Sequence, residues 1–361
     1  MAGVQAGKLP IWTMVTPFAG LAALAIGTGG GIATAIVALI LGACVLAAVH
    51  HAEVVAHRVG EPYGTLILAI AVTVIEVALI VSIMLSDGAG AQALARDTVF
   101  AAQMIVLNGI VGTCLLLGAS RHHEQSYTQT GVSAALAMVA TLAVLTLLLP
   151  NYTTSVPGPV YTSSQLAFVG VVSLVIYGVF VLAQTVRHRD YFLPFDASPG
   201  DVDAHAAPPS KQVALSAVGL LLVALVAVVL LAKALSPTIK AGVAAIGAPE
   251  AAVGIVIAGL VLLPEGLAAA RAARADRLQT SLNLALGSAL ATIGLTIPVV
   301  AFLSILFDWK LVLGLDAKST VLLVLSLMVS ILSLGTGKTT VLQGTVHLVI
   351  FAAFLFTTLV P

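Results

Sequence analysis

The chain has 361 residues, of which 60% are hydrophobic and only 8% are charged, and its formal net charge at pH 7 is zero. A soluble domain carries about 25% charged residues, so this composition excludes a protein that faces water on all sides. No basic stripe with interleaved aromatic residues is present, and we expect no nucleic-acid partner. The two cysteines lie in apolar runs, which predicts neither a disulfide nor a cysteine metal site, and no cofactor is expected.

Apolar segments long enough to cross a membrane follow one another along the chain, since a spanning helix needs about 20 apolar residues. Eleven such segments are expected, at 11–28, 31–50, 62–86, 98–118, 131–150, 164–186, 212–235, 243–270, 279–306, 318–334 and 339–360. The Asp- and Pro-rich stretch 187–211 indicates a connector. We therefore expect an all-α integral membrane protein with about 11 transmembrane helices. Its predicted parts are an N-terminal helix (1–30), a first half (31–186), a cytoplasmic linker (187–211) and a second half (212–361).

The lysines and arginines fall unevenly between the loops on the two sides of these spans. With the N-terminus placed in the cytoplasm, ten are cytoplasmic and five, namely Arg96, Lys233, Lys240, Lys310 and Lys318, are external. Cytoplasmic loops carry an excess of basic residues. The sequence therefore predicts a multi-pass protein of the cell (inner/plasma) membrane with a cytoplasmic N-terminus and, given an odd number of spans, an external C-terminus.

Two of the fifteen acidic residues lie deep inside apolar segments. Glu76 lies in LILAIAVTVIEVALIVSIML and Glu265 in GIVIAGLVLLPEGLAAA. A charge at the bilayer centre costs at least ~2.5–3.5 kcal/mol, so an intramembrane carboxylate indicates a functional site. The alternative is a protonated glutamic acid that is hydrogen-bonded inside the bundle.

The two glutamates occupy related positions in the two halves. Glu61 and Glu250 each lie 15 residues before the deep glutamate of their half, and the predicted topology runs the two spans in opposite directions. This arrangement indicates inverted repeats, which place a transport site at their interface. Pro264 and Gly266 flank Glu265, and we expect the helix to break there and to free carbonyl oxygens for a cation.

Paired carboxylates suit the exchange of a cation for protons. Calcium prefers carboxylate, carbonyl and water oxygens, and the same carboxylates, with pKa values raised by burial, bind protons near neutral pH. Thr73, three residues before Glu76 on the same helical face, adds a hydroxyl oxygen. If only the loaded site crosses the membrane, exchange is obligatory. The sequence thus predicts a secondary cation/proton antiporter.

Four segments resemble the calcium:cation antiporter superfamily and, more closely, its bacterial calcium/proton (also sodium-potassium/proton) antiporters of the ChaA kind. They are HAEVVAHRVGEPYGTLILAIAVTVIEVALI (51–80), RDTVFAAQMIVLNGIVGTCLLLG (96–118), LVLLPEGLAAARAARADRLQTSLNLALGSALATIGLTIPVV (260–300) and TTVLQGTVHLVIFAAFLF (339–356). The resemblance implies ten core helices in two inverted five-helix repeats plus one N-terminal helix. It also implies calcium, sodium or potassium ions as substrates.

The resemblance assigns cation binding to Glu76 and Glu265, and polar ligands to Asn108, Ser288 and Thr292. The family's Gly-Asn-x-x-Glu pattern is replaced by Val-Thr-Val-Ile-Glu at 72–76, and Leu262 stands where an Asn could precede Glu265. Loss of an amide oxygen favours monovalent cations, so a monovalent cation/proton antiporter stays open as the alternative.

Several other polar residues are candidates for proton coupling or gating. Glu61 could stage cations or protons, and His57 belongs to a cluster of histidines and acids that is either a pH gate or a solvated interfacial group. His347, inside the last span, is either a proton relay or a core residue whose hydrogen bonds are satisfied.

Two other functions are weighed against exchange. A cation channel would need a selectivity ring, and an intramembrane enzyme would need paired aspartates or a Ser/His pair, which the sequence does not suggest. Transported ions, protons and lipid are the expected partners, with a homo-oligomer as a further possibility.

Overall fold

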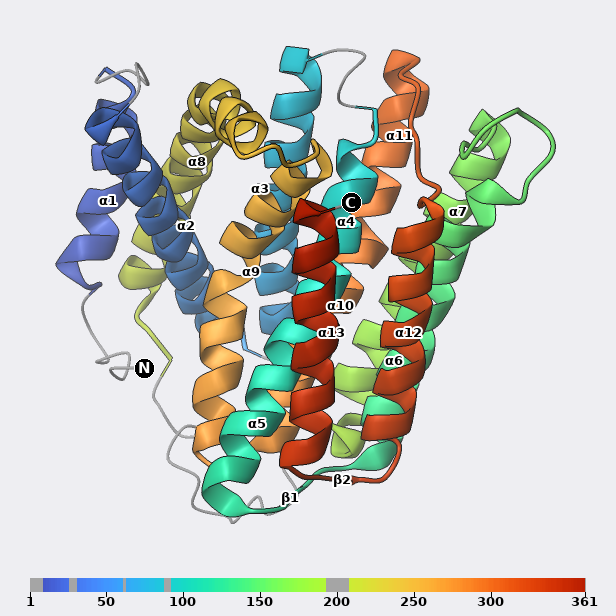
Figure 1. The fold of residues 1–361 in the computed structure, drawn as a ribbon. Coiled ribbons are helices and arrows are strands. Elements are labelled where there is room, and N and C mark those ends of the chain that lie inside the picture. The colour runs from blue at the N-terminus through green and yellow to red at the C-terminus, as the bar shows by residue number, and fades with distance from the viewer. Residues whose placement is uncertain (1–8, 26–30, 61–62, 88–91, 193–207, 361) are drawn as a thin grey trace. The chain divides into compact units, whose positions relative to one another are not determined.

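The computed structural model describes residues 9–25, 31–60, 63–87, 92–192 and 208–360. Its helices and strands in chain order are α1 (Ile11–Ala23), α2 (Ile32–Val59), α3 (Tyr63–Asp87), α4 (Leu94–Met104), η2 (Ile105–Ile110), α5 (Val111–His122), β1 (Gln125–Ser126), α6 (Gln129–Ala143), η3 (Val144–Leu148), η4 (Leu149–Asn151), α7 (Ser163–Leu182), η5 (Ala183–Arg187), η6 (Arg189–Tyr191), α8 (Lys211–Ala245), α9 (Ala251–Arg274), α10 (Leu278–Ala291), η8 (Thr292–Thr296), α11 (Ile297–Phe307), α12 (Ala317–Leu334), β2 (Lys338–Thr339) and α13 (Val341–Leu359) (Figure 1). Of the η elements, η2, η3, η5 and η8 are π-helices, and η4 and η6 are 3₁₀-helices.

The fold confirms an all-α membrane protein. Within the described residues, ten helices are long and apolar enough to cross a membrane, and α1 is a shorter apolar helix. Two sets of five long helices follow one another along the chain, as expected for two inverted repeats that follow an N-terminal helix. With 13 residues, α1 is about 20 Å long, shorter than the ~30 Å hydrocarbon core, so the full span expected at 11–28 is not present in its described part.

Three expected helix limits were wrong. The second span was expected to end at residue 50, but α2 continues to Val59 and carries the histidine cluster within the helix. The span expected at 212–235 continues to Ala245 in α8, past Pro237, and α9 consequently starts at Ala251 rather than at 243. A proline in a membrane helix is tolerated where neighbours satisfy the freed backbone groups.

The chain divides into two compact units. One unit contains α1, α2, α3 and α8, and the other contains α4 to α7 and α9 to α13. In the first unit α2 packs along α8, and α1 packs against both. His51, on α2, is buried, and its Nε2 lies 2.9 Å from the Thr13 carbonyl oxygen of α1.

The second unit is built around two long antiparallel helices, each interrupted by a π-helix. One is α4–η2–α5 and the other is α10–η8–α11. Near their middles Gln103 Nε2 donates to the Ala289 carbonyl oxygen at 2.9 Å, and past the end of α5 the Thr128 backbone N–H donates to Gln279 Oε1 of α10 at 2.6 Å. Helix α9 packs along α4, α13 along α5, and α12 beside α6 and α13.

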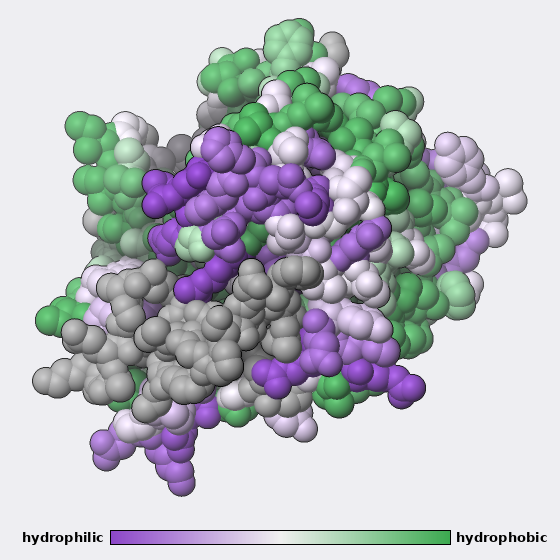
Figure 2. Space-filling view, turned by 90° about the horizontal axis from the view of Figure 1, so that it is seen from below, coloured by the Kyte–Doolittle hydropathy of each residue, from purple (hydrophilic) through white to green (hydrophobic). Residues whose placement is uncertain are grey.

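Strands β1 and β2 pair at one end of the second unit and join the helix ends there. Gln125 Nε2 donates to the Ala273 carbonyl oxygen at 3.1 Å, and Lys338 pairs with Glu124 at 2.8 Å. Burial raises the pKa of the Tyr127 hydroxyl to about 12, so this group stays protonated. Figure 2 looks onto this end and shows hydrophilic residues gathered on it and apolar residues beside them, as expected for an end that faces water.

The sides of the helices are apolar where they are exposed. The exposed large side chains of α7 are Phe168, Val171, Leu174, Val175, Val179 and Leu182. Apart from the adjacent pair Leu174 and Val175, they are spaced by three or four residues along one face. A monomeric soluble protein rarely exposes such a continuous apolar strip. We therefore expect these exposed apolar helix faces to contact lipid.

Candidate functional site

Glu76 lies on the buried face of α3 in the first unit. The buried positions of this helix include Val72, Ile75, Leu79 and Ile80, and Glu76 stands among them with 2% of its surface exposed. Thr73, one turn earlier, is buried on the same face. A carboxylate in the middle of a 25-residue apolar helix is therefore shielded from bulk water, as the sequence predicts for an intramembrane acid.

Glu265 lies near the middle of α9 in the second unit and is half-buried. The expected break beside it is wrong, because α9 runs without interruption from Ala251 to Arg274 with Pro264 inside it. The proline nevertheless has no N–H for the carbonyl of Leu260, so the helix lacks one backbone hydrogen bond a turn before Glu265.

Asn108 lies in the π-helix η2, which packs against α9. The contact is close near Glu265, since a Cβ on Gly266 would stand 3.2 Å from Ile110 Cδ1. Asn108 is fully buried, and its Nδ2 donates to Ser326 Oγ of α12 at 2.8 Å. Within the described chain its Oδ1 accepts no hydrogen bond.

Ser288 and Thr292 lie on the antiparallel helix. Ser288 is half-buried in α10, and Thr292 is buried at the start of the π-helix η8. Ala289, next to Ser288, accepts the hydrogen bond from Gln103. The second unit thus packs together the helices that carry Glu265, Asn108, Ser288 and Thr292. Single-turn π-helices are frequent at functional sites, and two of these candidates lie in them.

The candidates for proton coupling have different surroundings. His347 of α13 is fully buried, and its Nε2 lies 2.7 Å from Ser333 Oγ of α12. The expectation that no Ser/His pair lies in the membrane was wrong, because residues on two helices side by side meet at a sequence distance of 14. His57 is exposed near the end of α2, and Glu61 lies outside the described residues.

No three His, Cys, Asp or Glu side chains come together as a metal site among the residues that the structure describes. A cation held by these candidates would be bound mainly by carboxylate, amide and hydroxyl oxygens, which are the ligands that calcium and other hard cations prefer.

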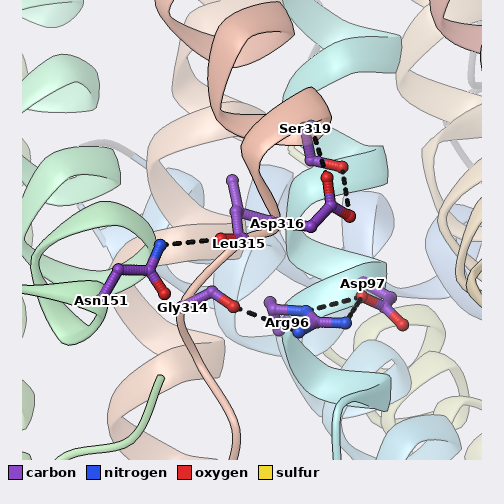
Figure 3. A network of polar contacts seen from close by, with 7 residues as sticks. All are labelled: Arg96, Asp97, Asn151, Gly314, Leu315, Asp316 and Ser319. Atoms are coloured by element: carbon purple, nitrogen blue, oxygen red, sulfur yellow. Dashed lines mark hydrogen bonds and ion pairs between the residues drawn. The ribbon is translucent and has the colours of Figure 1, made fainter. Parts of the chain in front are cut away.

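A polar network closes the opposite end of the second unit, where α4 begins (Figure 3). Arg96 pairs with Asp97 at 2.7 Å and donates to the Gly314 carbonyl oxygen at 3.1 Å, while Asp316 caps α12 by accepting from the Ser319 backbone N–H at 2.8 Å. A cavity of about 240 Å³ lies here, lined by Arg96, Asp97, Phe100, Ala101, Pro249, Ala251, Ile255, Asp316, Lys318, Ser319, Phe354 and Thr358. These bonds hold the loop before α12 against the start of α4.

Sequence reasoning missed the polar side chains of α12. Ser326, Ser330 and Ser333 are buried on one face, and they touch Asn108 and His347 through Ser326 and Ser333. Their spacing of four and three residues was the available signal, because such positions share one side of a helix.

Comparison with known proteins agrees with this architecture. The profile of the sodium/calcium exchanger protein family matches residues 30–186 and 216–360. A protein of Sinorhizobium fredii (strain NBRC 101917 / NGR234), y4hA, whose name describes an ionic transporter, is 48% identical over an alignment of 364 positions, which covers 99% of this chain and 98% of the relative. The sodium-potassium/proton antiporter ChaA of Escherichia coli (strain K12) is 37% identical over 310 residues, 86% of this chain and 84% of ChaA.

Solved structures share the fold at low sequence identity. Native YfkE has a TM-score of 0.74 at 14% identity, with 97% of this chain and 99% of YfkE covered. The H⁺/Ca²⁺ exchanger CAX has a TM-score of 0.72 at 16% identity, with 96% of this chain and 87% of CAX covered.

Proposed function

The chain belongs to the sodium/calcium exchanger family of membrane transporters, and from this premise we propose that it is a secondary antiporter that exchanges calcium, and also sodium or potassium, for protons. One observation carries the proposal: each half of the chain places a glutamate near the middle of its second long helix, Glu76 in α3 and Glu265 in α9. No structural requirement of an apolar helix explains a carboxylate at that depth.

The two glutamates bind cation and protons alternately. Deprotonated, they offer the charge and oxygens that a cation needs, and protonated they are neutral. A doubly charged empty site is too costly to reorient in lipid, so only a loaded or protonated site changes sides. Thr73, Asn108, Ser288 and Thr292 complete the site with neutral oxygens, which favour the cation and contribute nothing to proton binding.

Proton coupling is assigned to the glutamates themselves, with His347 as a relay on the hydroxyl of Ser333 and with Glu61 and His57 near the predicted cytoplasmic mouth. The N-terminus is placed in the cytoplasm and the C-terminus outside a cell membrane. The distribution of basic residues supports this orientation.

A second candidate is exchange of monovalent cations for protons without calcium transport. The observation that favours it is the side chain one turn before each glutamate, Thr73 in α3 and Leu262 in α9, which provide one hydroxyl and no amide. With fewer strong oxygen ligands, a site dehydrates a divalent cation less well. The relative from Escherichia coli is named for sodium, potassium and protons.

The test uses the purified full chain in liposomes that contain a pH-sensitive dye. Calcium, sodium and potassium gradients are applied in turn, and proton movement against an imposed pH gradient is measured. Proton-coupled flux with calcium supports the first candidate, and flux with monovalent ions alone supports the second. A current that follows the cation gradient without moving protons contradicts both candidates and identifies a channel.

A further inference from the structure

The amide group of Asn108 is held at one end only. Nδ2 donates to Ser326 Oγ at 2.8 Å and lies 3.9 Å from Met104 Sδ, which is within reach of a weak N–H···S hydrogen bond. Both N–H groups of the amide are therefore engaged. Oδ1 is buried and accepts no hydrogen bond from the described residues.

The hydroxyl of Ser326 explains why the nitrogen faces it. A serine has one O–H to donate, and here it points to the Leu322 carbonyl oxygen at 2.7 Å, with Met104 Sδ at 3.4 Å as its other acceptor. In both cases the lone pairs of Oγ face Asn108 and need a donor. A flipped amide would set oxygen against oxygen and would lose its contact with sulfur.

A buried carbonyl oxygen without a partner is unfavourable unless something binds it. We propose that Ser326 and Met104 are positioning residues that turn the Asn108 amide so that its Oδ1 is presented to the transported cation. This inference rests on the proposed function. Ser326 itself touches no cation and acts only through Asn108. The π-helix η2, which carries the amide, packs against both α12 and α9.

The arrangement has a consequence that a purely structural hydrogen bond lacks. A neutral amide oxygen binds a cation but does not take up the protons that compete for the glutamates. Loss of its orientation weakens cation binding and leaves proton binding unchanged. Protons then displace the cation at a lower proton concentration, so the pH at which cation uptake is half inhibited moves upward.

The test compares Ser326→Ala with Ser326→Thr and with Thr146→Ala in liposomes. Thr146 is the matched control, because its buried hydroxyl also donates to a carbonyl four residues earlier, Leu142 O at 2.7 Å, yet it is not bonded to Asn108. The proton flux driven by calcium, sodium or potassium is measured against cation concentration at several pH values. We expect Ser326→Ala to raise the half-saturating cation concentration about tenfold and to move the half-inhibition pH upward. Ser326→Thr should restore both, and Thr146→Ala should change neither.

A double-variant cycle separates positioning from folding. In the Asn108→Ala background, Ser326→Ala should add no further change in half-saturation. The inference is overturned if Ser326→Ala lowers only the maximal rate, if Thr146→Ala has the same effect, or if the two substitutions add. Its failure differs from a failure of the proposed function, in which the unsubstituted protein would show no cation-driven proton flux.

Discussion

The second long helix of each half carries a glutamate, Glu76 in α3 and Glu265 in α9, and the residues next to the two glutamates differ. In α3 the neighbours are Ile75 and Val77, and in α9 they are Pro264 and Gly266. The first pair is β-branched and stiff at χ1, and Glu76 stands in a regular helix on a buried face. The second pair lacks one backbone N–H, at Pro264, and one side chain, at Gly266, and Glu265 is half-buried.

This contrast suggests how one site can be built from two unequal halves. In the proposed site the first half contributes side chains, Glu76 and Thr73, from α3, a continuous helix that contains no proline. The second half contributes Glu265 and, at Leu260, a carbonyl oxygen that Pro264 leaves without its intrahelical donor. We infer that repeat symmetry fixes the carboxylates. The further oxygen on each glutamate-bearing helix comes from a side chain in α3 and from the backbone in α9, in addition to the side chains of Asn108, Ser288 and Thr292.

The largest expected effect comes from removing either charge. Glu76→Gln and Glu265→Gln keep the shape of the side chain and remove both proton exchange and the negative charge. We expect each to lower cation-driven proton flux at least about a hundredfold, which is about 2.7 kcal/mol. Liposome flux measures this, with Glu124→Gln as the control because that exposed acid lies at the end of the second unit, where it pairs with Lys338.

Equal losses in the two variants would mean that the halves are equivalent in chemistry despite their different surroundings. If only one of the two variants loses proton flux, the site uses a single carboxylate and the two glutamates are not functionally equivalent. Near-normal proton-coupled flux in both would refute the two-glutamate mechanism.

The contrast between α3 and α9 also shows what the sequence could and could not predict. Hydropathy located the ten long helices, because apolar length is a local property, and isolated acids in apolar runs located Glu76 and Glu265. Pro264 wrongly predicted a broken helix, since lipid-embedded helices continue through proline when neighbours accommodate it. The π-helices η2 and η8 depend on hydrogen-bond register, which no residue type specifies, and the Asn108–Ser326 bond joins residues 218 apart.

The next effect concerns how tightly α9 is held in the second unit. Gly254 lies against α4, and a Cβ there would stand 2.8 Å from the Asp97 carbonyl carbon and 2.9 Å from the Thr98 nitrogen. Backbone cannot yield as a side chain does, so Gly254→Ala should destabilise the protein by about 1–3 kcal/mol. Thermal unfolding of the purified protein in detergent measures the change.

Gly259, on the same helix, provides the control, since nothing lies within 4 Å of a Cβ placed there. Gly259→Ala should be neutral or stabilising by about 0.5–1 kcal/mol through helix propensity. Equal unfolding temperatures for the two variants would show that α9 does not depend on the close approach at Gly254.

A smaller effect tests the backbone oxygen assigned to the second half. Pro264→Ala restores an N–H that can bond to the Leu260 carbonyl, and alanine is the better helix former. We expect no loss of thermal stability. The half-saturating cation concentration should rise about three- to tenfold, because the site loses one oxygen ligand whose contribution is comparable to that of one hydrogen bond. Unchanged half-saturation would remove Leu260 from the site and make the proline a packing feature.

The smallest effect tests the side-chain oxygen of the first half. Thr73 and Leu262 stand at equivalent positions, three residues before the two glutamates, and both are buried. Thr73→Val keeps the shape and removes the hydroxyl, so the half-saturating cation concentration should rise a few-fold, consistent with about 1 kcal/mol for one neutral oxygen. Leu262→Val is the control in the other half, because no oxygen is lost, and it should leave half-saturation unchanged. Equal shifts in the two variants would mean that packing, rather than the hydroxyl, sets the affinity, and the division of oxygens between side chain and backbone would then fail.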